Sequence, residues 1–129
     1  MNKIIVEVSI GELLDKISIL EIKQGKIKDP EKLKFINNEH SILKSQLENN
    51  VKSDEKLNSL YESLKEINAK LWVIEDDKRQ CEKDKDFKEK FIKLSRDIHF
   101  LNDDRAKIKL EINNHTGSVI KEIKEYTNY

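Results

Sequence analysis

Polar and aromatic side chains recur at helical spacing in the second half of the chain, and together they could line a pocket. Trp72, Glu75 and Arg79 follow one another at steps of three and four residues. Such steps place side chains on one face of a helix. A second line in the next segment includes Asn102 and Lys109. If the two segments fold back on each other, the two lines bring a Trp, carboxylates and cationic groups to one polar pocket.

A chain reversal near Lys85 would decide which side chains of the two segments face each other. It would bring Arg96 level with Val73 and within reach of Glu75. We therefore expect the following candidate ligand-binding residues: Trp72, Glu75, Asp76, Arg79, Arg96, Asn102, Asp103, Arg105 and Lys109. The alternative reading is structural, because charged residues that flank an apolar helical seam usually form interhelical ion pairs that set the register.

The chain has only three arginines against 22 lysines. A guanidinium offers a planar fork for carboxylates and phosphates, which lysine cannot reproduce. Arg79, Arg96 and Arg105 are therefore candidates for bidentate contacts.

Arg105 is the only charge in the apolar seam of its segment between Phe87 and Ile112. A buried charge without a partner is strongly destabilising. We predict that Arg105 is paired with an acidic residue of the first helix, because that helix has the widest apolar stripe. The candidate partners in that helix are Glu12, Asp15 and Glu21, and Glu62 or Glu66 of the third helix is the alternative.

Paired acidic residues are the main feature that could support catalysis. Glu75-Asp76 and Asp103-Asp104 could supply oxygens to Mg²⁺, as in all-α nucleotide pyrophosphatases, but the Glu-Glu-x-x-Glu spacing of those enzymes is absent. A helical chorismate mutase is a looser match. No Cys or Ser stands near a His as covalent catalysis requires, and there is no Gly-rich phosphate loop or Cys/His metal set. We predict no catalytic residue, no metal and no cofactor.

Two heptad patterns between Leu57 and Ile112 would position the candidate residues. Apolar residues recur at steps of three and four on both sides of a polar break at Lys83–Asp86. Each pattern predicts a long helix with a narrow apolar seam, and the short break makes the two helices antiparallel. Cys81 occupies a seam position and should be a small buried hydrophobe. The second of these helices is expected to begin at Phe87.

The first part of the chain predicts a strand followed by two helices. Lys3–Val8 is short and rich in β-branched residues, which favours a strand. Ser9–Glu12 forms a capping box that starts a helix at Ile10. Asp29 and Pro30 then start a second helix, which should end near residue 49.

Three further residues predict where the long helices begin and end. Ser53 or Asp54 should cap the third helix, and Gly117 should stop the fourth near residue 115. Residues 118–129 are expected to form an ordered, non-helical tail. Pairing of Val119–Ile123 with the N-terminal strand is an alternative.

Composition agrees with a single elongated helical domain over residues 1–129. The chain is 39% charged and 36% hydrophobic, as expected for helices with one buried stripe each. Lys+Arg and Asp+Glu both number 25 and are interleaved, so no basic face for nucleic acid is visible. The sequence has no membrane-spanning run and no signal peptide, from which we expect a cytoplasmic location. The predicted fold is an all-α, elongated four-helix arrangement built on a long antiparallel helical hairpin.

Short segments distributed over almost the whole chain carry a resemblance to a protein family. They are Val8–Leu13, Leu20–Lys23, Leu71–Asp76, Asn102–Ala106, Ile112–Asn113 and Gly117–Ser118, with Lys124 and Tyr126. In these segments the chain resembles a family of small bacterial and marine-phage proteins with a domain of unknown function. Their genes often lie near glycosyltransferases of lipopolysaccharide or capsule synthesis. The resemblance implies an intact domain and a link to surface-polysaccharide biosynthesis. The chain departs from the Glu-Glu-Lys-Ser-Tyr ending of the family at Glu122–Tyr126.

Two functional hypotheses follow from the sequence. The first is a cytoplasmic protein-interaction module that forms a homodimer and assists polysaccharide biosynthesis, because one narrow seam per arm leaves apolar surface uncovered. The second is a binding protein for a small anionic metabolite, such as a nucleotide or nucleotide sugar, or a Mg²⁺-dependent enzyme resembling the pyrophosphatases. A concave pocket that brings together Arg79, Arg96 and Glu75 would favour a ligand, and a convex surface would favour protein contacts.

Overall fold

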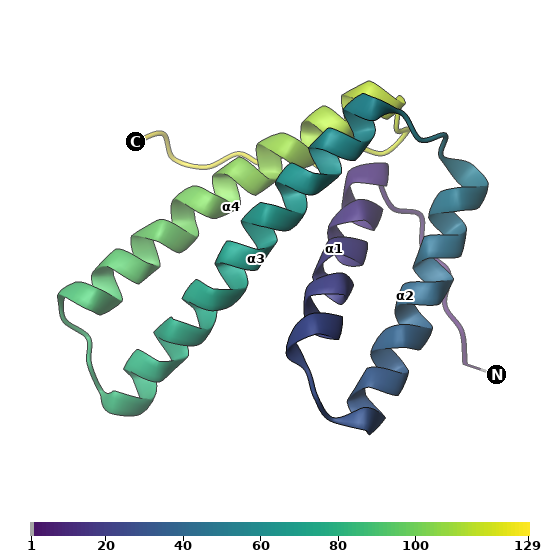
Figure 1. Ribbon diagram of the computed structural model, residues 1–129. Helices are drawn as coiled ribbons and strands as arrows, with labels where there is room; N and C mark the ends of the chain where they lie inside the picture. Colours follow the sequence, from purple (N-terminus) through teal and green to yellow (C-terminus); the bar gives the residue numbers. More distant parts are fainter. Residues whose placement is uncertain (1) are drawn as a thin grey trace.

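The computed structural model describes residues 2–129, most of which lie in four α-helices (Figure 1). The helices are α1 (Ile10–Lys26), α2 (Pro30–Asn50), α3 (Glu55–Asp84) and α4 (Glu89–Thr116). Residues 2–129 contain no strand. The all-α prediction with four helices is therefore confirmed.

The helices begin and end where local capping chemistry predicts. The Ser9 hydroxyl accepts a hydrogen bond from the Glu12 N–H at 3.0 Å and caps α1. Asp54 caps α3 by accepting from the Leu57 N–H at 2.7 Å. Gly117 ends α4 with a φ of 67°, in the left-handed region that favours glycine. These contacts satisfy terminal backbone groups that have no partner within the helix.

The connection between α3 and α4 has the length of the polar break but lies two residues later in the chain. Lys85 adopts a left-handed conformation with a φ of 56° directly after α3 ends at Asp84. The next helix begins at Glu89, so the predicted start at Phe87 is two residues too early. Phe87 instead lies in the loop and packs edge-on against Phe91, with ring centroids 5.5 Å apart.

α1 is the central helix of the fold. It packs on α2, α3 and α4, whereas α3 and α4 run antiparallel as a long pair whose far end extends away from α1 (Figure 1). Seven residues of α1 are buried, among them Leu14, Ile17 and Leu20. A wide apolar stripe lets one helix cover more than one neighbour, which explains this position.

The apolar core lies where α1 meets the open end of the α3–α4 pair. Leu14, Leu57, Leu64 and Ile112 form its buried cluster. The far half of the pair contributes little to it, because Cys81 is the only buried residue between positions 72 and 111. The prediction that Cys81 is buried is confirmed, with 3% of its surface exposed.

Both terminal segments are non-helical and start from one point of the bundle. The Ile10 N–H donates to the Ser118 hydroxyl at 3.1 Å, which holds the start of α1 beside the end of α4. The predicted strand at residues 3–8 is wrong, because no neighbouring strand in residues 2–129 pairs with it. The tail after Ser118 is non-helical, as expected. None of the four helices has an apolar stretch long enough to cross a bilayer.

Candidate functional site

A buried carboxylate, Asp15 of α1, is the centre of a polar network between α1, α3 and α4. Its side chain is 2% exposed. Arg105 of α4 binds the Asp15 carboxylate through two hydrogen bonds. Its Nε donates to Oδ1 at 2.9 Å, and its Nη2 donates to Oδ2. The prediction that an acidic residue of the first helix pairs with Arg105 is confirmed. Bidentate arginine pairs combine charge with fixed geometry, so this contact orients α1 on α4.

Two more side chains, Asn68 and Lys109, contact the Asp15 carboxylate. Asn68 of α3 donates from one amide nitrogen to Asp15 Oδ1 and to the Ser18 hydroxyl, each at 2.8 Å. Lys109 Nζ lies 3.7 Å from Asp15 Oδ2 and 2.6 Å from Glu12 Oε2. The network therefore joins three helices through one carboxylate.

The network keeps both members of the central pair charged. Burial by itself would raise the pKa of Asp15, but the hydrogen bonds from Arg105 and Asn68 outweigh it and leave that pKa below its ordinary value. The hydrogen bond to Asp15 raises the pKa of Arg105. A buried ion pair with its hydrogen-bonding groups satisfied is the arrangement that a low-dielectric interior tolerates.

Close backbone contact between α1 and α4 sets the geometry of this network. The Gly11 N–H donates to Asn113 Oδ1 at 2.7 Å. A Cβ added at Gly11 would lie 2.6 Å from the Lys109 carbonyl oxygen, closer than any side chain allows. Only glycine permits the two helices to come this near, which brings Arg105 and Lys109 within reach of α1.

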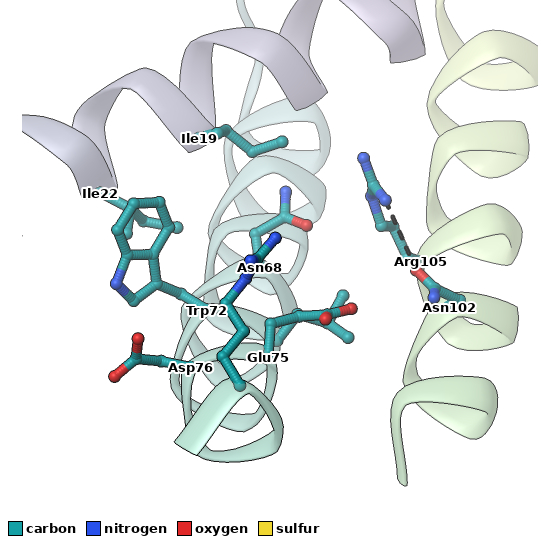
Figure 2. Close-up of a pocket in the computed structure, with 10 residues that line it drawn as sticks. Ile19, Ile22, Asn68, Trp72, Glu75, Asp76, Asn102 and Arg105 are labelled. Atoms are coloured by element: carbon teal, nitrogen blue, oxygen red, sulfur yellow. Dashed lines mark hydrogen bonds between the residues drawn. The ribbon is translucent and has the colours of Figure 1, made fainter. Parts of the chain in front are cut away.

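A cleft of about 320 Å³ lies beside the network, and α1, α3 and α4 all contribute to it. Figure 2 shows Trp72, Glu75 and Asp76 projecting from α3, of which Glu75 extends toward α4, the helix that carries Arg105 and Asn102. The lining residues are Ile19, Ile22, Asn68, Leu71, Trp72, Glu75, Asp76, Arg79, Asn102 and Arg105. The cleft thus combines an apolar wall, one indole ring and groups of both charges.

Some charged groups of the cleft are bound to other residues of the protein, and others are not. Arg105 is held by Asp15, and its Nη1 donates a long 3.5 Å hydrogen bond to Asn102 Oδ1. Within residues 2–129, neither Glu75 nor Asp76 nor Arg79 takes part in an ion pair. These three groups are exposed and line the cleft.

Six of the nine residues predicted to bind a ligand line this cleft, and three lie elsewhere. The six are Trp72, Glu75, Asp76, Arg79, Asn102 and Arg105. Arg96 does not line this cleft but a separate depression with Phe91 and Phe100, where its guanidinium lies 5.7 Å from the centroid of the Phe100 ring. Arg96 is nine residues before Arg105, about two and a half helical turns, so the two point to opposite sides of α4.

The remaining two predicted residues belong to other contacts. Asp103 accepts a hydrogen bond from the Tyr129 hydroxyl of the tail. Lys109 belongs to the Asp15 network, where it also lies 3.5 Å from Glu122. The acidic pairs Glu75-Asp76 and Asp103-Asp104 therefore do not converge. Within residues 2–129 no group of three or more His, Cys, Asp or Glu side chains is placed to hold a metal ion.

A second polar network, around Glu21 of α1, has no counterpart in the sequence-based predictions. Glu21 Oε2 lies 2.9 Å from His40 Nε2 of α2, and Oε1 lies 3.2 Å from Lys65 Nζ of α3. The Tyr61 hydroxyl also donates to Glu21. In the sequence, His40 follows Leu33 and Ile36 on heptad steps, which indicates a histidine with a partner at the core boundary but does not identify that partner.

Comparison with known proteins gives one finding. No match is found among curated proteins or among solved structures. The model of a family of unknown function, DUF6165, matches residues 4–129, and the chain belongs to that family.

Proposed function

We propose that the chain binds a small anionic metabolite in the cleft between α1, α3 and α4. The observation that carries this proposal is the exposed Arg79 guanidinium, which has no ion-pair partner within residues 2–129 and shares a concave site with Trp72. A guanidinium without a partner suits a phosphate or carboxylate. An indole ring beside it suits the face of a sugar or base.

The other lining groups extend this recognition. Glu75 and Asp76 are acceptors for hydroxyl groups, and Ile19 and Ile22 of α1 add apolar lining to the cleft. Small-molecule sites typically have an apolar lining with a small number of polar groups. A ligand with both a phosphate and hydroxyl groups, such as a sugar phosphate or a nucleotide sugar, matches this combination.

We further propose that the protein acts in the cytoplasm as an accessory to surface-polysaccharide biosynthesis. The support for this step is the family resemblance, which links the chain to genes of lipopolysaccharide and capsule synthesis. Phosphorylated sugars are the activated substrates of that class of reaction, and they are the ligands that the cleft chemistry favours. A Mg²⁺-dependent pyrophosphatase activity has less support, because the two acidic pairs do not converge in one group.

The binding proposal can be tested with the fluorescence of the protein itself. Trp72 is the only tryptophan of the chain and lines the cleft, so its emission should respond to an occupant. Titration with nucleotides, sugar phosphates and nucleotide sugars, each with and without Mg²⁺, should identify a ligand that changes this emission. The same ligand at 100 times its dissociation constant should stabilise the fold by about 2.7 kcal/mol in thermal unfolding.

A matched pair of arginine variants makes this test specific. Arg79→Gln should weaken binding by about tenfold or more, since a charge-assisted hydrogen bond contributes about 1.5–3 kcal/mol. Arg96→Gln removes the same charge from the opposite side of α4 and should leave binding unchanged. Equal weakening by both variants, or no response to any ligand of the panel, would refute binding at the cleft.

Self-association is a second candidate function, favoured by apolar side chains that the fold leaves exposed. Ile92 and Phe100 of α4 and Ile4 and Ile5 of the N-terminal segment are all exposed. A large exposed apolar area on a single chain indicates a contact surface. We propose that the protein forms a homodimer, and light scattering should give the mass of two chains at micromolar concentration. A monomer mass over the whole concentration range would reject this candidate without affecting the cleft.

A further inference from the structure

The N-terminal segment, residues 3–8, has the composition of a strand and nothing to pair with. Ile4 is 90% exposed, Ile5 81% and Val6 69%. No hydrogen bond joins residues 2–8 to residues 9–129. The segment thus presents free backbone donors and acceptors together with β-branched side chains, which is how an unpaired strand edge recruits another strand.

Two copies of this segment have complementary charges when they run antiparallel. If two copies run antiparallel with Ile5 opposite Ile5, Lys3 of each copy lies opposite Glu7 of the other. Ile4 then lies opposite Val6, so β-branched residues also face each other. Opposite charges and β-branched pairs across an antiparallel ladder are stabilising, whereas a parallel arrangement would place Lys3 against Lys3 and Glu7 against Glu7.

The C-terminal tail of the same chain is already engaged and does not compete for this strand. Glu122 lies 3.5 Å from Lys109 Nζ and 2.6 Å from Lys124 Nζ. Tyr129 packs against His99, with ring centroids 4.8 Å apart. The tail is therefore held along α4, while the N-terminal segment leaves the bundle from the same point without such contacts.

We propose that residues 3–8 of two copies pair as an antiparallel two-stranded ribbon around a two-fold axis at Ile5. This proposal rests on the self-association proposed above and assigns its interface. A two-fold axis repeats each contact, so the ribbon contains the Lys3–Glu7 pair twice. The ribbon is smaller than a standard protein interface, which predicts a weak dimer whose population depends on protein concentration.

A charge-swap series tests the pairing. Lys3→Glu and Glu7→Lys each turn both ion pairs into like-charge pairs and should weaken the dimer by roughly tenfold. The double variant Lys3→Glu/Glu7→Lys restores opposite charges and should dimerise like the unmodified chain. Both positions lie outside the helical bundle, so circular dichroism should report unchanged helix content in all three variants.

Cysteine cross-linking tests the register independently. Ile5→Cys chains should form a disulfide-linked dimer on mild oxidation, because position 5 faces itself across the axis. Ile4→Cys chains should cross-link to Val6→Cys chains faster than to each other. The unmodified chain is the control, since its single cysteine, Cys81, is buried.

The outcomes separate this proposal from the two functions proposed above. Weakening by each single swap, rescue by the double swap and the 5–5 and 4–6 cross-links would support the ribbon. A dimer that both single swaps leave intact, or one that cross-links without regard to position, would overturn the ribbon and leave the homodimer standing. A chain that is monomeric throughout would overturn the ribbon and the homodimer together, while ligand binding at the cleft would be unaffected.

Discussion

α1 carries two carboxylates, Asp15 and Glu21, that bind different sets of helices and are buried to different depths. Asp15 is 2% exposed and pairs with Arg105 of α4 and Asn68 of α3. Glu21 is 20% exposed and binds His40 of α2 and groups of α3. The Asp15 network joins α1 to α3 and α4, and the Glu21 network joins α1 to α2 and α3.

The difference in depth also changes the kind of partner. Asp15 meets a guanidinium that is charged at any pH at which the protein is folded, so the buried carboxylate keeps its counter-charge. Glu21 is partly exposed to water, and its contacts are divided among His40, Tyr61 and Lys65. We therefore expect the Asp15 network to contribute more than the Glu21 network to the docking of α1. Substitutions at the two sites test this difference.

Removing the guanidinium at the deep site should have the largest effect. Arg105→Met leaves Asp15 as a buried charge without its main partner, which costs about 3–5 kcal/mol of unfolding free energy. Arg105→Lys keeps the charge but loses the bidentate fork and should be intermediate. Urea denaturation of both variants measures these costs.

Two controls show whether the loss of stability comes from the broken Asp15–Arg105 ion pair. Arg96→Met removes an exposed arginine from the same helix and should change stability little. The double variant Asp15→Asn/Arg105→Met removes both charges and should recover part of the loss. Coincident denaturation midpoints for Arg105→Lys and the unmodified chain would show that the fork does not matter, and the contrast between the two carboxylates would then fail.

The second prediction compares the two glycines at opposite ends of α1. Gly11→Ala places a Cβ 2.6 Å from the Lys109 carbonyl oxygen and must push α1 away from α4. Overpacking of this kind costs about 1–3 kcal/mol. Gly25→Ala meets no atom within 4 Å, so it should have no steric cost and should stabilise the helix by up to about 1 kcal/mol. Thermal unfolding of the two variants should therefore move in opposite directions, and equal shifts would argue against the close contact at Gly11.

The third prediction concerns the shallow site. Glu21→Gln keeps the size of the side chain and can still bond to Tyr61, but it loses the charged contacts with His40 and Lys65. We expect a loss of about 1 kcal/mol, because the carboxylate is partly solvated. The same denaturation series measures it. A loss as large as that of Arg105→Met would mean that both sides of α1 are equally important.

The same contrast explains what the sequence could predict. Capping residues act on their own helix, so Ser9, Asp54 and Gly117 located the ends of α1, α3 and α4 without knowledge of the fold. A charge in an apolar seam must be paired wherever it lies, so the acidic partner of Arg105 could be expected from the first helix. The sequence could not predict that this partner is Asp15, because that depends on how closely α1 packs against α4 at Gly11.

Features that depend on the relative placement of helices were missed. The partners of Glu21 come from α2 and α3, and no local pattern gives their register against α1. The two polar lines did predict most of the cleft, but Arg96 was assigned to the wrong side because the rotation of α4 is fixed by Arg105. The N-terminal segment shows the opposite error, since β-branched composition at Lys3–Val8 favours a strand only where a partner strand exists.

The smallest effect should appear in the pH dependence of stability. Burial would raise the pKa of Asp15, but hydrogen bonds from Arg105 and Asn68 outweigh it and lower that pKa. At Glu21, burial is likewise outweighed by hydrogen bonds from Tyr61, His40 and Lys65. As the pH falls, each carboxyl binds a proton in the unfolded chain before it does so in the folded chain. Each therefore contributes stability above the ordinary carboxyl pKa of about 4, and this contribution is lost as the pH falls through the lower folded value.

Asp15→Asn and Glu21→Gln should each reduce the loss of stability that the unmodified chain shows below about pH 4. The cost of each substitution should accordingly be greatest near neutral pH and shrink in acid. Guanidinium or urea denaturation at a series of pH values measures how the stabilities of the variants and the unmodified chain approach each other in acid. Asp77→Asn is the control at an exposed position and should follow the unmodified chain. Parallel stability curves for the unmodified chain and Asp15→Asn across the acid range would mean that folding does not favour the ionised Asp15. The network would then have to stabilise α1 through packing and neutral hydrogen bonds alone.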